Sequence, residues 1–264
     1  MKNVLLVGAP NSGKSALFNR LTGLQHKVAN YPGITIDVGS GALRSDARTQ
    51  VWDFPGTYSL SAISGEEEVA IDALRSALAD ERPAVVAMVL DATRLEKGLT
   101  YCLQVAREAA QSKKPFVVLL NMMDILERNE LALDLDGLRA SLGVPVLPVS
   151  ARTGEGVEAA EAALLSTSTA QSPWADTPDA LIEGSAQQIA DRFVPQGELL
   201  VRRQAKIDNW LLGTASGGVA FVVIMTLFFQ AIFTWSAPLM DGVEALILGL
   251  GAWLVPLVPE GIFA

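Results

Sequence analysis

The chain has 264 residues and a formal net charge of −9, which allows one domain of ordinary size with a smaller addition and argues against nucleic acid as a partner. A single cysteine, Cys102, excludes an internal disulfide and suits a reducing compartment. Half of the residues are hydrophobic, a high share for a purely soluble protein.

Residues 1–166 alternate between apolar runs of strand length and helical patterns. The strand candidates are 3–8, 51–54, 85–91, 115–121 and 144–151, and the helix candidates are 14–22, 66–78, 98–111, 134–142 and 157–165. Continuous apolar runs are typical of strands buried on both faces, as in a parallel sheet. The alternation therefore predicts an α/β domain with helices on both sides of the sheet.

Residues 167–208 are predicted to form a linker followed by a short helical domain. The linker is polar and contains proline. The pattern after it is helical and has one apolar face, made of Ile182, Ala186, Ile189 and Phe193.

The region after Asp208 has no charged residue until Asp241. A bilayer-spanning helix needs about 20 mostly apolar residues, so residues 209–236 are predicted to cross a membrane. Every lysine and arginine precedes this stretch, which places the domain before it in the cytoplasm. Residues 237–264 are apolar but carry acidic residues and prolines, and they predict an interfacial or re-entrant segment.

The stretch GAPNSGKS, residues 8–15, directly follows the first predicted strand and opens a helix, which is the context of a phosphate-binding loop. Its glycines let backbone N–H groups face a phosphate, and the helix N-terminus adds a favourable dipole. Lys14 is expected to reach the β- and γ-phosphates of a nucleotide, and Ser15 to bind Mg2+.

Two later features would complete the phosphate end of the site. In DFPG, residues 53–56, Asp53 is expected to hold Mg2+ through water, and the Gly56 N–H to contact the γ-phosphate. Thr35 lies between the two motifs, where a switch threonine would complete the Mg2+ shell. The expected Mg2+ ligands are therefore Ser15, Thr35 and Asp53.

The motifs NMMD, residues 121–124, and SAR, residues 150–152, predict recognition of guanine. The Asp124 carboxylate would accept from guanine N1–H and N2–H2, a donor pair that adenine lacks. Asn121 would tie this motif to the phosphate loop, and the Ala151 N–H would bind the guanine carbonyl oxygen. Met122 stands where lysine is usual and lacks its polar contacts, which predicts modest affinity and fast nucleotide release.

The full set of expected nucleotide contacts comes from these motifs and the segment before Thr35. It consists of Gly8, Ala9, Pro10, Asn11, Ser12, Gly13, Lys14, Ser15, Ala16, Gly33, Ile34, Thr35, Asp53, Gly56, Asn121, Met122, Asp124, Ser150, Ala151 and Arg152.

With these motifs in place, the sequence resembles the bacterial ferrous iron transporter B family, FeoB. The resemblance rests on DFPGTYSLSAISGEEEVA at 53–70, VANYPGIT at 28–35 and NMMD. It implies a Ras-like P-loop GTPase fold with a mostly parallel six-stranded sheet, a helical domain that modulates nucleotide affinity, and a multi-helix Fe2+ transport domain. The implied function is GTP binding and hydrolysis that regulates Fe2+ transport, with the G domain on the cytoplasmic side of the bacterial inner membrane.

The resemblance also implies a K+ site. Asn11 matches the asparagine that coordinates an activating K+ in similar GTPases, and the carbonyls of Ala29 and Tyr31 would complete it. K+ there would place positive charge where the transition state develops negative charge. The expected catalytic residues are Lys14, Asn11, Thr35 and Gly56. Thr57 stands where Ras-like enzymes place the glutamine that orients water, so slow intrinsic hydrolysis is expected.

Compared with the family pattern, the sequence predicts a short helical domain and a single membrane span, and its 264 residues include no stretch expected to form the transport domain. Two alternatives stay open: a GTPase of the ribosome-assembly or tRNA-modification kind, which shares the GxPNxGKS loop, and a nucleotide-sensing switch with negligible turnover. The expected partners are guanine nucleotide, the lipid bilayer, the downstream transport domain, and a second copy of the chain or a small accessory protein.

Overall fold

The computed structural model describes residues 2–23, 27–31, 37–61, 65–167, 172–193 and 213–254. The chain divides into two compact units, residues 1–197 and residues 198–264. The predicted boundary between residues 208 and 209 lies outside the described residues, and the division of the chain into domains at that point stays a prediction.

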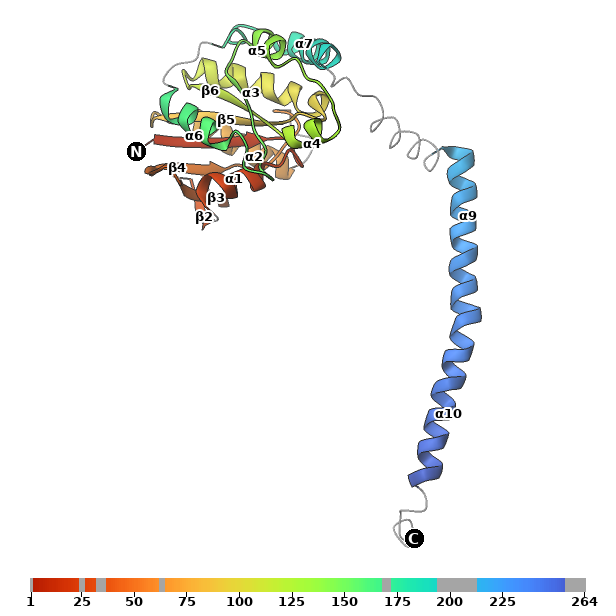
Figure 1. The fold of residues 1–264 in the computed structure, drawn as a ribbon. Helices are drawn as coiled ribbons and strands as arrows, with labels where there is room; N and C mark the ends of the chain where they lie inside the picture. The colour runs from red at the N-terminus through yellow and green to blue at the C-terminus, as the bar shows by residue number, and fades with distance from the viewer. Residues whose placement is uncertain are drawn as a thin grey trace. The chain divides into compact units, whose positions relative to one another are not determined.

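A seven-stranded sheet in the order β2-β3-β4-β1-β5-β6-β7 forms the centre of the first unit (Figure 1). Its strands are β1 Lys2–Gly8, β2 Lys27–Asn30, β3 Asp37–Leu43, β4 Asp46–Asp53, β5 Ala84–Asp91, β6 Phe116–Asn121 and β7 Val146–Pro148. The strands from β4 to β7 in this order run parallel, and β2 and β3 pair antiparallel at one edge. The mixed α/β fold with a mostly parallel sheet is confirmed, and the short strand β2 adds a seventh strand at the edge.

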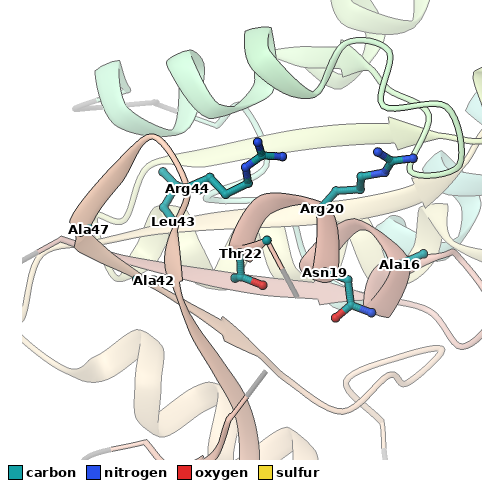
Figure 2. A pocket seen from close by; sticks show the side chains of 9 residues that line it. Ala16, Asn19, Arg20, Thr22, Ala42, Leu43, Arg44 and Ala47 are labelled. Atoms are coloured by element: carbon teal, nitrogen blue, oxygen red, sulfur yellow. The ribbon is translucent and has the colours of Figure 1, made fainter. Parts of the chain in front are cut away.

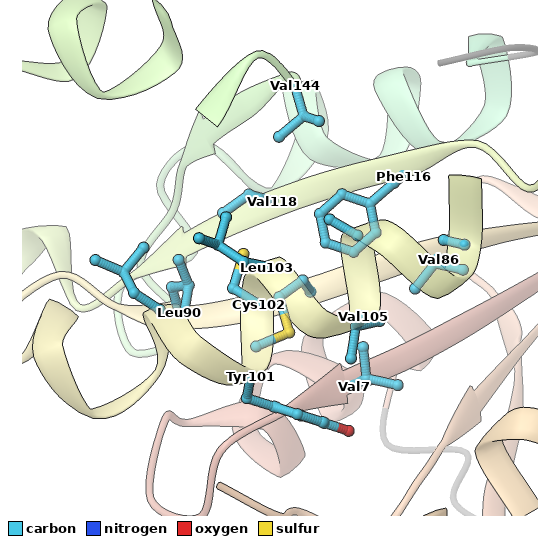
Figure 3. Packing of buried hydrophobic residues seen from close by; sticks show 14 of the residues in the cluster. Val7, Val86, Leu90, Tyr101, Cys102, Leu103, Val105, Phe116, Val118 and Val144 are labelled. Atoms are coloured by element: carbon cyan, nitrogen blue, oxygen red, sulfur yellow. The ribbon is translucent and has the colours of Figure 1, made fainter. Parts of the chain in front are cut away.

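Helices cover both faces of this sheet. They are α1 Lys14–Thr22, α2 Gly65–Ala79, the 3-10 turn η1 Leu95–Lys97, α3 Leu99–Gln111, α4 Met123–Arg128, α5 Leu135–Leu142, α6 Val157–Ser166 and α7 Asp179–Arg192. Side chains of β1 alternate between the faces: Leu5 and Val7 join a core with α2, α3, α5 and α7, whereas Val4 and Leu6 join a core with α1 and α6. Figure 3 shows the first core, where Cys102 and Leu103 of α3 lie among residues of the central strands.

The helix α7 packs against α3 within the first unit. Its apolar face is the one the sequence predicts, since Ile182, Ala186 and Ile189 are buried. Asp179 at its start forms an ion pair with Arg107 of α3, with Oδ1 and Nη1 2.5 Å apart. This helix therefore extends the hydrophobic core of the α/β domain.

The described part of the second unit is helical throughout: α9 Thr214–Gln230, a π-helical turn η2 Ala231–Trp235, and α10 Ser236–Leu254. One helix among the described residues is long and apolar enough to cross a bilayer, over Ser216–Thr234, and no side chain of its most apolar window is buried. The sequence offers a local cause for the π-turn: Pro238 lacks an N–H, and in a regular α-helix its ring would collide with the carbonyl of Thr234 four residues earlier. Of the segment 237–264, expected to be interfacial or re-entrant, residues 237–254 belong to α10, and residues 255–264 lie outside the described part of the chain. Its position relative to a bilayer stays a prediction.

Candidate functional site

The predicted motifs gather at the carboxyl edge of the parallel strands. The register pairs Leu6 of β1 with Asp53 of β4, and Asp91 of β5 with Asn121 of β6. The phosphate loop, DFPG and NMMD therefore all begin at one edge of the sheet, where open α/β sheets bind their ligands.

The phosphate loop has the backbone that its glycine predicts. Gly13 has φ +82°, a left-handed conformation that a Cβ would strain. A Cβ there would also lie 2.2 Å from Nδ2 of Asn121 and 3.6 Å from Cε of Met122. Gly13 thus provides the space in which the guanine motif reaches the phosphate loop.

Asn121 connects three segments of the site. Its side chain is buried, and its Nδ2 donates to the Ser12 carbonyl at 2.9 Å. Its Oδ1 accepts from the Ala151 N–H at 2.9 Å. The N–H expected to face guanine is thus hydrogen-bonded to Asn121, and the predicted link between NMMD and the phosphate loop is present.

Asp124 is buried at the start of α4 and accepts two hydrogen bonds. The Ser150 hydroxyl donates to Oδ1 at 2.7 Å, and Arg152 Nε donates to Oδ2 at 2.7 Å. The bond from Ser150 is the largest cause that holds the pKa of Asp124 below its ordinary value, and the Arg152 guanidinium lowers this pKa further, against the opposing effect of burial. The carboxylate is therefore ionised and aligned at neutral pH.

At the phosphate end of the site, the DFPG segment lies close to the phosphate loop. Lys14 in the first turn of α1 forms an ion pair with Asp53 at the end of β4. A Cβ on Gly56 would lie 3.1 Å from both the Gly8 carbonyl oxygen and the Pro10 nitrogen. DFPG therefore lies against the phosphate loop, as expected of a segment that contacts the γ-phosphate.

For the remaining predicted residues, the structure gives less information about a role in nucleotide binding. Gly33, Ile34 and Thr35 lie outside the described residues. Asn11 is exposed with φ +63°, and the described residues show no hydrogen bond between it and Ala29 or Tyr31. The Thr57 hydroxyl is buried and donates to the Ser59 carbonyl at 3.0 Å.

One residue at the site was not predicted. Arg20 of α1 donates from Nε to the Ala151 carbonyl at 2.9 Å and from Nη2 to the Arg152 carbonyl at 2.6 Å. These partners are 131 and 132 residues away in sequence, so no local pattern indicates the contact.

Comparison with known proteins places this arrangement in a family. A family described as Ferrous iron transport protein B matches residues 2–164. The Fe(2+) transporter FeoB of Leptospira biflexa is 40% identical over 157 residues, which are 59% of this chain and 22% of that protein. The Fe(2+) transporter FeoB of Escherichia coli K12 is 38% identical over 164 residues, which are 60% of this chain and 20% of that protein.

Solved structures agree with the sequence relatives. The crystal structure of NFeoB from S. thermophilus bound to GDP.AlF4- and K+ is 36% identical with a TM-score of 0.54, covering 65% of this chain and 63% of that one. The cytosolic domain of L. pneumophila FeoB is 34% identical with a TM-score of 0.54, covering 64% of each chain. The present chain spans about a fifth of the length of the curated relatives it matches. By its motifs, fold and relatives, this chain belongs to the ferrous iron transport protein B family, and residues 2–164 form the N-terminal domain of that family.

Proposed function

We propose that this chain binds guanine nucleotide at the carboxyl edge of its sheet and hydrolyses GTP there, as the cytoplasmic regulatory part of a ferrous iron transporter. The observation that carries the proposal is the bridge made by Asn121 between the Ser12 carbonyl and the Ala151 N–H. It holds the phosphate-binding and base-reading segments together as one site. The S. thermophilus relative bound to GDP.AlF4- and K+ supports the same use of the fold.

The base end is built to discriminate guanine from adenine. Asp124 is an oriented carboxylate that would accept from guanine N1–H and N2–H2, and adenine would leave it without those donors. The Ala151 N–H would share its hydrogen between Asn121 and the guanine carbonyl oxygen. The Met122 side chain, with its methyl group near Gly13, would cover the base.

At the phosphate end, Lys14 would exchange its ion pair with Asp53 for the β- and γ-phosphates. Ser15, Thr35 and Asp53 would hold Mg2+, which supplies positive charge to the phosphates when bound. The acid–hydroxyl donor set fits this ion, because Mg2+ prefers oxygen ligands and Asp53 lies beside the phosphate loop at Lys14. The N–H of Gly56, whose backbone lies against the phosphate loop, would contact the γ-phosphate.

Asn11 and the carbonyls of Ala29 and Tyr31 would hold K+, which supplies further positive charge to the transition state when bound. The exposed, left-handed Asn11 at the tip of the phosphate loop supports this role. The Thr57 hydroxyl is hydrogen-bonded within its own turn, which supports slow hydrolysis without K+. In the whole protein, the nucleotide state would regulate Fe2+ transport by a membrane domain to which α9 belongs, and α9 would lie in the bacterial inner membrane.

The proposal is tested by nucleotide binding to the full chain in detergent micelles. We expect GDP and GTP to bind and ADP not to compete. Asp124→Asn should weaken GDP binding and improve binding of xanthosine diphosphate, whose C2 oxygen accepts from the new amide. Unchanged base preference in this variant would refute the assignment of the base end.

The K+ role has a separate test. GTP turnover should be faster in KCl than in NaCl, and Asn11→Ala should remove this difference while GDP binding is largely kept. K+ stimulation that survives in Asn11→Ala would place the cation elsewhere.

A further inference from the structure

Arg20 holds two successive carbonyl groups of the base-reading loop. Its Nε and Nη2 donate to the carbonyls of Ala151 and Arg152, at 2.9 and 2.6 Å. Figure 2 shows the Arg20 side chain extending from α1, with its guanidinium apart from that of Arg44, which comes from the turn after β3. A guanidinium is a rigid fork, so two bonds from one side chain hold both peptide groups in a defined orientation.

Two hydrogen bonds connect the second of these peptide groups to the carboxylate of Asp124, which is proposed to bind guanine. A peptide unit is planar, so its carbonyl and its N–H point in opposite directions. The unit whose carbonyl belongs to Arg152 has its N–H on Thr153, and that N–H donates to the Ser150 Oγ at 3.1 Å. The Ser150 hydroxyl then donates to Oδ1 of Asp124 at 2.7 Å.

The geometry points to Arg20 as a positioning residue for guanine specificity. It holds the peptide between Arg152 and Thr153, that peptide orients the Ser150 hydroxyl, and the hydroxyl aligns Asp124 with the N2 amine of the base. Arg20 itself touches no nucleotide in this scheme. The inference rests on the proposed function, because it concerns the specificity of the same guanine site.

The consequence is measurable as selectivity for the N2 amine. Inosine diphosphate, IDP, differs from GDP only in lacking this amine, so the ratio of the two dissociation constants reports how well Asp124 is aligned. Arg20→Ala should weaken GDP binding and reduce the GDP-over-IDP preference by about threefold to tenfold, the range of one ordinary hydrogen bond. The kcat at saturating GTP should change by less than about twofold, because the phosphate end is untouched.

Three variants separate this route from simpler ones. Arg44→Ala is the matched control. Arg44 and Arg20 line one pocket beside α1, and among the described residues no hydrogen bond joins the Arg44 side chain to the loop of residues 150–153. Arg20→Lys keeps the charge but not the fork, and should recover only part of the preference. In a Ser150→Ala background, Arg20→Ala should have little further effect on the ratio, because the connection to Asp124 is already cut.

The measurements are titrations of the full chain in detergent with GDP, IDP and ADP, with the melting temperature of each variant recorded. An unchanged GDP-over-IDP ratio in Arg20→Ala, full recovery in Arg20→Lys, or the same loss in Arg44→Ala would overturn the inference, and so would full additivity with Ser150→Ala. If Arg20→Ala does not fold, Arg20→Lys takes its place, alone and in the Ser150→Ala background, and the same comparisons decide the matter. Failure of the wild-type chain to prefer GDP over ADP would instead refute the proposed function, and the inference with it.

Discussion

Replacement of Asn121 by alanine tests the bridge that joins the two halves of the site. Asn121 is 2% exposed, and the variant leaves the Ser12 carbonyl and the Ala151 N–H without their partner. An unsatisfied buried polar group costs about 1–3 kcal/mol. Ala151 is 8% exposed and Ser12 3%, so the Ala151 N–H is the less costly of the two groups to leave unpaired. We therefore expect Asn121→Ala to lower the free energy of unfolding by about 2–4 kcal/mol, a large share of a typical total.

The assay uses the single cysteine as a probe. Cys102 is buried in α3, so the fraction of thiol that reacts in a short pulse of labelling reports unfolding of the α/β domain across a urea series, in the full chain in detergent. Asn19→Ala is the control, because Asn19 is only half-buried on α1 and its side chain makes no hydrogen bond among the described residues. It should change stability by no more than about 0.5 kcal/mol. A loss in Asn121→Ala as small as that of the control would refute the bridge.

The same reasoning predicts that the stability losses caused by Gly13→Ala and Asn121→Ala do not add. In the wild-type background the new methyl group would meet Asn121 Nδ2 at 2.2 Å and would also strain the left-handed backbone. In the Asn121→Ala background only the backbone strain remains. The cost of Gly13→Ala should therefore be smaller there by at least about 1 kcal/mol, and additive costs would show that the two groups do not meet.

Three further predictions concern acid, thiol reactivity and packing. The pKa of Asp124 is held below its ordinary value of 3.8. The contribution of the ionised carboxylate to GDP binding is therefore complete above pH 3.8 and is lost as the pH falls through the pKa in the folded protein. Protonation of Asp124 should thus not weaken GDP binding between about pH 5 and 8, the range in which the terminal phosphate of GDP itself titrates. Arg152→Ala should move the loss of affinity at acid pH to higher pH, because it removes a group that lowers the pKa of Asp124; an identical acid midpoint would contradict this. Burial raises the pKa of Cys102 to about 12, so the native thiol should be inert to disulfide reagents at neutral pH, and GDP should slow its labelling further; rapid labelling of the folded chain would disprove this. Ile182→Ala should cost about 2–5 kcal/mol in the urea assay if α7 belongs to the core, whereas the exposed Leu181→Ala should cost little.

Local signals in the sequence predicted much of the fold. The bounds of α1 follow from the phosphate loop before it and Gly23 after it, and β5 and β6 follow from continuous apolar runs. The strands β2 and β3 were not predicted, because β2 is four residues long and β3, DVGSGAL, has two glycines and a weak apolar pattern. They exist through antiparallel pairing with each other and with β4, which is a tertiary effect. The six-residue helix α4 was missed for a similar reason, since it is too short to show a period.

The sequence by itself determined the chemistry of the site, because each motif is a short stretch whose residue types suffice to suggest phosphate, Mg2+ or guanine. The tertiary structure alone decided how these stretches act on one another. Asn121 meets Ser12 across 109 residues, and Arg20 meets Ala151 across 131. Such contacts depend on which strands are neighbours in the sheet and on the direction in which each loop leaves its edge, and neither is encoded in a local pattern of residues.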